Sequence, residues 1–272
     1  MGRALPARIC AMLLACALFF PLAARADIQT IRSADSEVWA SAGESLLNYK
    51  ESIPITPDGE HGWTPSFAGG VSYLTNGNWY FALDAAYTFG DDQYSGFYYY
   101  LNNPNVLYPT KLTTKESITT VDGKIGRGFT LGKYAMLTPY GEFGFRYWGR
   151  QTDAQTEDYQ NFDFLFGLMG QVSPVNRLVL SAYGSYGPTF GAQMKSDGVT
   201  YNLGSAGMMK LGGKVGFNLT QRLELFTTLD YDHLHYVKSA PEYDQNLGGY
   251  FLEPSSHTND TAWRVGLGYH FK

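Results

Sequence analysis

The most regular pattern along this chain is a strict alternation of apolar and polar positions, seen best at 79–89. The positions between the apolar ones are small or polar and include Asp84. Successive side chains of a β-strand point to opposite faces, so a period of two predicts a strand with one apolar and one polar face. The apolar, mostly aromatic positions are Trp79, Phe81, Leu83, Ala85, Tyr87 and Phe89.

Ten segments of this kind are predicted, and each has 10–14 residues, which is enough for a tilted strand to cross a membrane, since that needs about 9–11 residues. In the first segment, Trp39, Leu47 and Tyr49 are assigned to the outer face. In the last, Trp263 and Tyr269 point outward and His270 inward. We predict an all-β, ten-stranded antiparallel transmembrane β-barrel, with eight or twelve strands as alternatives. The segments are 37–49, 64–74, 79–90, 117–129, 137–148, 162–173, 178–187, 207–219, 222–235 and 261–271.

The connections between these segments alternate in length. Short links carry turn residues such as Asn76-Gly77 and Pro174. Membrane barrels of bacteria have short periplasmic turns and long external loops, so the alternation predicts the same arrangement here. The long, polar links are predicted at 50–63, 91–116, 149–161, 188–206 and 236–260.

The start of the chain has the pattern of a secretory signal peptide. Arg3 and Arg8 precede an apolar run, and Ala24-Arg25-Ala26 supplies small residues at the expected cleavage site. We predict a signal peptide at 1–26, a periplasmic N-terminal segment at 27–36 and a transmembrane β-barrel at 37–272.

Cleavage near Ala26 would leave 246 residues without either cysteine, so no disulfide or thiol chemistry is expected. The remaining 17 basic and 25 acidic residues give a net charge of about −8. An acidic chain of this kind is a poor candidate for binding nucleic acid.

Charged side chains of both signs are predicted to face the barrel lumen. They are expected to pair, because an isolated charge in a narrow lumen is costly. Barrels of about eight strands are filled by side chains, whereas aqueous pores need about sixteen strands. We therefore expect a thin water file at most. The predicted lumen charge network is Asp84, Asp122, Lys124, Glu142, Arg146, Asp163, Lys210, Lys214, Glu224, Asp230, Asp232 and Arg264.

Two segments resemble known barrels. The closing run Ala262-Trp263-Arg264-Val265-Gly266-Leu267-Gly268-Tyr269-His270-Phe271 resembles the C-terminal signal of bacterial outer-membrane barrels, although Lys272 follows the final aromatic residue. The run Leu137-Thr138-Pro139-Tyr140-Gly141-Glu142-Phe143-Gly144-Phe145 resembles a strand of the small OmpA-like barrel superfamily of Gram-negative bacteria. This resemblance implies location in the cell outer membrane, contact with its lipids and lipopolysaccharide, and insertion by the barrel assembly machinery.

The ten-strand layout with five long loops also resembles the omptin proteases. That resemblance implies two acids near the third and fourth strands, facing an Asp-His pair near the seventh and eighth. Asp91 and Asp92 occupy the first place, but adjacent strand residues point to opposite faces. In the second place the one acid is Asp197, and no histidine occurs between Gly62 and Asp232. Without a base the mechanism has no proton acceptor, so we predict that the chain is not an omptin-type enzyme.

A sequence cluster at 230–235 combines two acids with two histidines. On a strand, the two acids share the inner face while His233 and His235 share the outer face, so the four side chains cannot converge. Lipid A deacylases and acyltransferases use an inward histidine near the outer leaflet, whereas His270 belongs to the periplasmic end. No catalytic residue is predicted.

The first and last long loops contain weak candidates for a metal site. His61, with Asp58 and Glu60, could approach His257 and Asp260, because barrel closure makes these loops neighbours. Solvated loop residues are the more common outcome, so neither a metal nor a cofactor is predicted.

The second long loop is rich in aromatic and amide side chains, which together form good surfaces for proteins or sugars. The alternative is that the aromatic rings pack on neighbouring loops. The candidate ligand surface consists of Tyr94, Phe97, Tyr98, Tyr99, Tyr100 and Tyr108.

Three function classes remain open. The leading prediction is a monomeric, non-enzymatic outer-membrane protein that binds an extracellular protein or glycan, or supports the envelope. The alternatives are a narrow channel for small solutes and an outer-membrane hydrolase of the omptin or lipid A deacylase type.

Overall fold

The computed structural model describes residues 27–52, 58–100, 103–152, 155–196, 198–245 and 248–271. The predicted signal peptide, 1–26, lies outside these residues. Within them, no helix is long and apolar enough to span a membrane.

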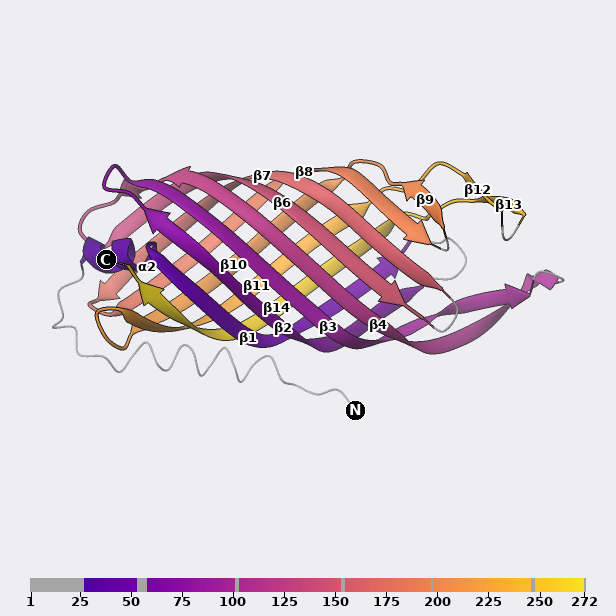
Figure 1. Ribbon diagram of the computed structural model, residues 1–272, viewed down its shortest axis with the longest axis horizontal. Helices are drawn as coiled ribbons and strands as arrows, with labels where there is room; N and C mark the ends of the chain where they lie inside the picture. Colours follow the sequence, from indigo (N-terminus) through magenta and orange to yellow (C-terminus); the bar gives the residue numbers. More distant parts are fainter. Residues whose placement is uncertain are drawn as a thin grey trace.

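Ten long antiparallel strands form a closed barrel, which confirms the predicted fold class (Figure 1). Each of the ten long strands pairs with its neighbours in chain order, including β8 with β10, and the pairing of β14 with β1 closes the barrel. The strands are β1 (Glu37–Glu51), β2 (Gly59–Leu74), β3 (Trp79–Tyr100), β4 (Asn103–Arg127), β6 (Ala135–Gln151), β7 (Thr156–Val175), β8 (Leu178–Ser196), β10 (Gly207–Asn218), β11 (Leu223–Tyr236) and β14 (Ser256–His270).

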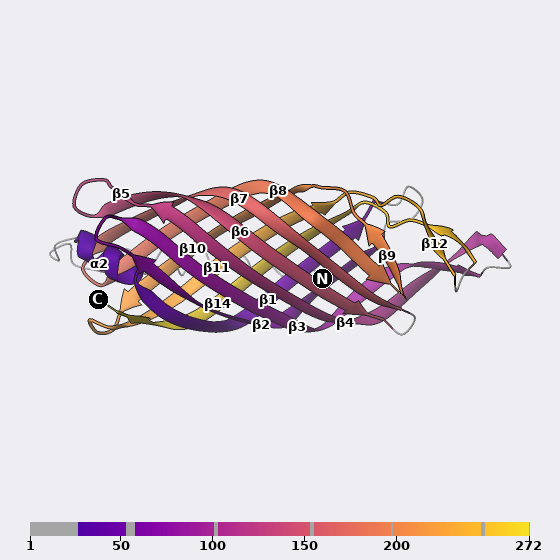
Figure 2. The same ribbon diagram turned by 45° about the horizontal axis from the view of Figure 1, so that its top comes forward.

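Five short elements accompany the ten long strands. The helix α2 (Ile28–Ala34) lies at one end, together with the C-terminus and the short turns (Figures 1 and 2). We call this the short-turn end. At the opposite, long-hairpin end, β9 (Val199–Asn202) pairs with β8, and β12 (Glu242–Asp244) pairs with β13 (Gly249–Phe251). The fifth, β5 (Phe129–Thr130), pairs with β6.

The outer surface carries a belt of exposed apolar side chains, as a membrane-spanning strand requires. Large aromatic residues stand at both rims of the belt: Trp63 and Trp263 toward the long-hairpin end, Trp79 and Tyr269 toward the short-turn end. Aromatic rings of this kind favour the membrane–water interface. The side chains between these rims include Phe67, Val71, Phe81, Leu83, Val121, Ile125, Phe143, Phe164, Phe166, Leu225, Val265 and Leu267.

The prediction that the long connections are loops is wrong for most of their length. The segment 91–116 is largely strand, since β3 and β4 continue to Tyr100 and from Asn103. Likewise β7 starts at Thr156 and β8 ends at Ser196. The physical reason is that these extensions lie beyond the apolar belt. Water replaces lipid on their outer face, so the apolar–polar alternation that marks a membrane strand disappears although the backbone pairing continues.

The orientation predicted for the first strand is also wrong. Trp39 lines the interior, and Leu47 and Tyr49 are almost completely buried inside the barrel. The outer face of β1 carries Val38, Ala42 and Glu44 instead. Three large apolar residues were mistaken for a lipid-facing set because the interior of this barrel is itself partly aromatic.

Candidate functional site: a sealed, charge-lined lumen

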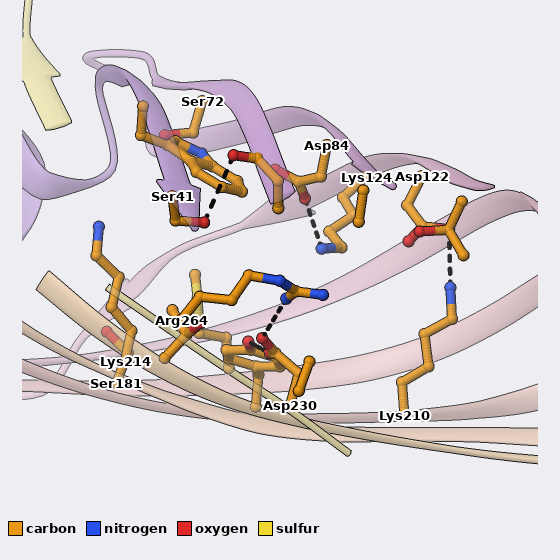
Figure 3. A pocket seen from close by; sticks show the side chains of 18 of the residues that line it. Ser41, Ser72, Asp84, Asp122, Lys124, Ser181, Lys210, Lys214, Asp230 and Arg264 are labelled. Carbon is orange, nitrogen blue, oxygen red and sulfur yellow. Dashed lines mark hydrogen bonds and ion pairs between the residues drawn. The ribbon is translucent and has the colours of Figure 1, made fainter. Parts of the chain in front are cut away.

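The main internal feature is a cavity of about 240 Å³ in the middle of the lumen, lined by charged and hydroxyl side chains (Figure 3). The lining begins at Ala34 and Asp35, near α2, and extends to Ile118 and Asp260 toward the long-hairpin end. Strands from all sides of the barrel contribute to it, so its chemistry depends on the closed fold.

Ion pairs connect the charged side chains that line the cavity, two of them between neighbouring strands and those of Lys210 across the lumen (Figure 3). Lys124 Nζ lies 2.7 Å from Asp84 Oδ2, and Arg264 Nη1 lies 3.1 Å from Asp230 Oδ2. The Nζ atom of Lys210 has three acidic partners: Glu142 at 2.7 Å, Asp122 at 2.8 Å and Asp163 at 3.8 Å. The lysine thus offsets the repulsion among three carboxylates on neighbouring strands.

Two further groups of charged residues extend this network toward the two ends of the barrel. Near the short-turn end, Lys214 Nζ lies 2.5 Å from Glu37 Oε1 and 2.7 Å from Glu224 Oε1, and His270 Nε2 lies 3.3 Å from Glu224 Oε2. Toward the long-hairpin end, Arg146 Nη2 donates to Asp260 Oδ2 at 2.8 Å.

The structure places all twelve predicted network residues inside the barrel, and Asp232 lines the cavity with them. Two carboxylate groups could in geometric terms hold a metal ion: Glu37, Glu224 and His270, and Asp122, Glu142 and Asp163. In each group a lysine ammonium already supplies the positive charge, Lys214 in the first and Lys210 in the second. We therefore interpret both clusters as ion-pair networks and not as metal sites.

The helix α2 closes the short-turn end. Its Ile31 is completely buried and packs with Ala34 against Leu74, Met136 and Val179. Fully burying one such side chain contributes about 1.5–3 kcal/mol. Polar contacts fix the helix in place: Arg32 donates to Thr75 O at 2.9 Å and also to Asn78 Oδ1, and Gln171 Nε2 donates to Asp35 Oδ1 at 2.7 Å. The predicted N-terminal segment is thus a plug.

An aromatic layer closes the other side of the cavity. It consists of Tyr49, Trp148, Tyr159 and Tyr236, each fully buried. Their ring centroids are 5.0 Å apart for Tyr49–Trp148, 4.9 Å for Trp148–Tyr159 and 5.6 Å for Tyr159–Tyr236. Aliphatic side chains such as Leu165 complete the same cluster. The four rings therefore fill much of the lumen at this level.

A buried arginine organises the side of the aromatic layer that faces the long-hairpin end. Arg150 Nε donates to Glu60 Oε2 at 2.9 Å, and its Nη1 donates to Glu157. Its guanidinium lies 4.8 Å from the centroid of the Tyr49 ring and 5.3 Å from that of Trp148. Such cation–π contacts favour a desolvated arginine above aromatic rings.

Glu116 is a buried acid next to the same arginine and glutamates. It lies beyond the apolar belt, because the outward residues at its level, Lys115 and the paired Asp91, are polar and exposed. Burial raises the pKa of Glu116 to about 10, and the adjacent charge of Glu60 acts in the same direction. Trp148 Nε1 donates to its Oε2 at 2.5 Å. At neutral pH this carboxyl is therefore neutral and hydrogen-bonded.

Replacing Glu116 with glutamine is expected to flatten the pH dependence of stability. The folded state keeps the proton up to about pH 10, whereas the unfolded chain loses it near pH 4.5. The stabilisation from this group is therefore complete below pH 4.5 and is lost progressively above it, by at most about 1.4 kcal/mol per pH unit. Urea unfolding in lipid vesicles between pH 5 and 9 measures the slope. Glu44→Gln, on the outer face of β1, is the matched control; equal slopes for Glu116→Gln and the unchanged chain would contradict the assignment.

The two acids compared with those of the omptins, Asp91 and Asp92, point to opposite faces of β3, as predicted for adjacent strand residues. Asp91 is exposed on the outer face of β3, and Asp92 is buried on the inner face. Asp197 lies outside the described residues. All five histidines are described, and none faces Asp92: His270 is at the short-turn end, and the other four are on the outer face. Within the described ranges, no histidine therefore joins an inward aspartate at the long-hairpin end.

The residues of the weak metal candidate separate in the structure. Glu60 and Asp260 point inward to Arg150 and Arg146. His61 and His257 point outward but lie on β2 and β14, with β1 between them. Asp58 Oδ2 accepts from Tyr94 Oη at 3.0 Å.

The aromatic loop residues lie on the β3–β4 hairpin. Tyr94 is half-buried against Asp58, and Phe97 is exposed. Tyr98 pairs with Tyr108 in the backbone register, which then shifts before Tyr100. The side chains of Tyr98, Tyr99 and Tyr100 lie outside the described part of the structure.

Several site residues were not found from the sequence. Glu37, Arg150 and Glu157 fall in segments where the alternation is weak or was assigned to loops. The buried aromatic layer was missed for the same reason. A useful signal would have been the continued alternation of large and charged residues at 146–150, where Arg146, Trp148 and Arg150 share one face.

Comparison with known proteins agrees with this architecture. The family profile described as outer membrane protein beta-barrel domain matches residues 12–170, more than half of the chain. A search of curated protein sequences finds no significant match.

Solved structures give the same fold. The chain is similar to the outer membrane protease OmpT from Escherichia coli, with a TM-score of 0.64, 9% identity, and coverage of 87% of this chain and 97% of that one. Weaker likeness extends to Neisserial surface protein A (TM-score 0.36, 9% identity, 86% and 97% coverage) and to the attachment invasion locus protein Ail of Yersinia pestis (TM-score 0.29, 12% identity, 87% and 99% coverage).

Proposed function

Because this chain belongs to the outer membrane protein beta-barrel domain family and is located in the outer membrane, we propose that it is a non-enzymatic surface-binding barrel whose β3–β4 hairpin contacts an extracellular ligand. We place the long-hairpin end outside the cell, since the tight turns of outer-membrane barrels face the periplasm. We also propose that the protein is a monomer whose outer surface contacts outer-membrane lipids and lipopolysaccharide.

The observation that carries this proposal is the length of the hairpin beyond the sheet. β4 pairs with β6 from Lys115 onward, and β2 pairs with β3 as far as Ser95. Among the described residues, the hairpin between these points has no further strand on either side, so it stands out as a two-stranded ribbon (Figure 1). An isolated ribbon of this kind is marginally stable by itself, and a binding partner would stabilise it.

The surface of the hairpin suits a protein ligand. Exposed Phe97 offers apolar contact area, and the open strand edge offers unpaired backbone donors and acceptors. Pro104, Pro109 and Lys111 lie along the same ribbon, and proline and lysine on an edge discourage self-association. The edge is thus suited to a selected partner more than to a second copy of the chain.

The closed lumen and the placement of the histidines support a non-enzymatic role. The cavity lies between α2 and the aromatic layer, so a solute would need both seals to move. At the long-hairpin end, the buried acids Glu60 and Glu157 contact Arg150, and no histidine faces buried Asp92. A hydrolase would need a base of suitable pKa within hydrogen-bonding distance of its substrate.

Shortening the hairpin is expected to reduce adhesion at least about tenfold while the barrel stays folded. A tenfold loss of affinity corresponds to only about 1.4 kcal/mol of binding free energy. Ser95 pairs with Lys111, so an Asn-Gly turn joining these two residues in place of 96–110 preserves the register. Cells that display either form would be tested for adhesion to epithelial cells and to immobilised matrix proteins.

The matched control shortens a second ribbon at the same end. Glu242 pairs with Phe251, so residues 243–250 can be replaced by the same turn. Heat-dependent mobility on denaturing gels verifies folding. Equal adhesion of the β3–β4 variant and the complete barrel would remove this proposal, and cleavage of fluorogenic dibasic peptides by the displayed barrel would favour a hydrolase instead.

A further inference from the structure

Three of the five histidines lie together on the outer surface of the barrel. His233 and His235 are two positions apart on β11 and share its outer face, and His257 on β14 is the direct cross-strand partner of His235. The ring centroids of His235 and His257 are 4.3 Å apart with an interplanar angle of 12°, and those of His233 and His257 are 5.9 Å apart. We call these residues the three-histidine cluster.

The cluster is located just beyond the rim of the apolar belt. Exposed Trp263 marks that rim on β14, and His257 is six residues further toward the long-hairpin end. On the other side of β14, His257 pairs with Lys50 of β1. His257 is exposed, and the other two rings are half-buried. All three side chains are therefore accessible to solutes in the water layer next to the membrane.

A neighbouring amide fixes the tautomer of one ring. Tyr231 Oη donates to Asn259 Oδ1 at 2.7 Å, and His233 Nδ1 lies 2.8 Å from the same oxygen. An amide oxygen only accepts hydrogen bonds, so Nδ1 of His233 is the donor in this contact and Nε2 is the ring nitrogen that remains for a metal ion. Metal-binding histidines typically donate their other ring N–H to a carbonyl in this way, which orients the ring.

We propose that the three-histidine cluster is a binding site for a divalent transition metal of the Zn²⁺ class on the outer surface of the barrel. Imidazole nitrogen suits Zn²⁺, Cu²⁺ and Ni²⁺, and three imidazoles leave one tetrahedral position for water or an external donor. Cross-strand neighbours have Cβ atoms about 4.5–5.5 Å apart, so the three side chains are close enough to share an ion once their rings rotate to turn one nitrogen each toward it. The ligand set differs from the His61–His257 pair that the sequence suggested, and it does not depend on the β3–β4 hairpin.

Cobalt absorption tests the site directly. The full-length mature barrel, prepared without a histidine tag in detergent micelles, would be titrated with Co²⁺ at pH 7.5 and then with Zn²⁺. We expect visible absorption of a four-coordinate Co²⁺ at about one ion per barrel, displaced by Zn²⁺. His235→Gln and His257→Gln should lose this absorption. Asn259→Leu should weaken binding about 10–100-fold, because it removes the partner that orients His233.

His61→Gln is the matched control, since His61 is also an outward histidine but belongs to β2. It should bind Co²⁺ like the unchanged barrel. Equal binding by the His235 and His257 variants would overturn the proposal. So would binding of inorganic phosphate at pH 5.5 without any Co²⁺ absorption at pH 7.5, because that result would assign the cluster to anions through protonated rings. Surface substitutions of this kind leave the barrel folded, which heat-dependent gel mobility verifies.

Discussion

Replacing Arg150 with methionine is expected to destabilise the barrel by about 3–5 kcal/mol, because it leaves buried carboxylates without a counter-charge. The guanidinium is 5% exposed and contacts both Glu60 and Glu157, whose side chains are 0% and 9% exposed. It also stacks over Tyr49 and Trp148 in the aromatic layer. Urea unfolding in lipid vesicles, followed by tryptophan fluorescence, measures the loss in the free energy of unfolding.

Two further variants separate the buried pairing from a general effect of charge. Arg127→Met removes an exposed arginine at the short-turn end and should cost less than about 1 kcal/mol. Arg150→Lys should recover only part of the stability, because an ammonium cannot form the same fork of hydrogen bonds or stack as a planar group. A loss below about 1 kcal/mol for Arg150→Met would show that the two acids protonate at little cost, and that the arginine does not hold the layer together.

The barrel itself was predictable because lipid imposes a simple rule on each strand. Within the apolar belt, the outward side chains of β3 and β14 follow the period of two, so the position of these segments and the face that each side chain occupies were predicted correctly. The twelve charged lumen residues share the opposite face of such strands. Their individual partners were not predictable, because a partner such as Asp122 for Lys210 depends on the distance across the barrel and not on strand order.

The seals and the three-histidine cluster were missed for two different physical reasons. Tyr49 and Trp148 belong to parts of the strands beyond the apolar belt, where an aromatic interior and a polar exterior reverse the membrane pattern. His257 joins His235 only through the β11–β14 register, which brings together residues that are 22 positions apart. The helix α2 follows from local sequence, including its Asp27 cap, but its burial of Ile31 requires the barrel around it.

Opening the lumen to ions is expected to require the removal of both seals. The helix α2 and the aromatic layer lie in series along the barrel axis, so either one alone prevents conduction. In planar bilayers we expect no current steps from the complete barrel, from a variant that lacks Ile28–Ala34, or from Trp148→Ala with Tyr159→Ala. The combination of all three changes should produce discrete steps.

The open form should prefer cations, because the twelve charged lumen residues comprise seven acids and five bases. Asp122→Asn in the combined variant should reduce that preference, measured as the reversal potential in a salt gradient, while Glu44→Gln on the outer face should leave it unchanged. Current steps of equal size from the complete barrel would show that α2 and the aromatic layer do not block conduction, and would favour a narrow channel. A silent combined variant that still migrates as a folded barrel would contradict them as well, because the ion-paired side chains between the two ends would then block the lumen by themselves.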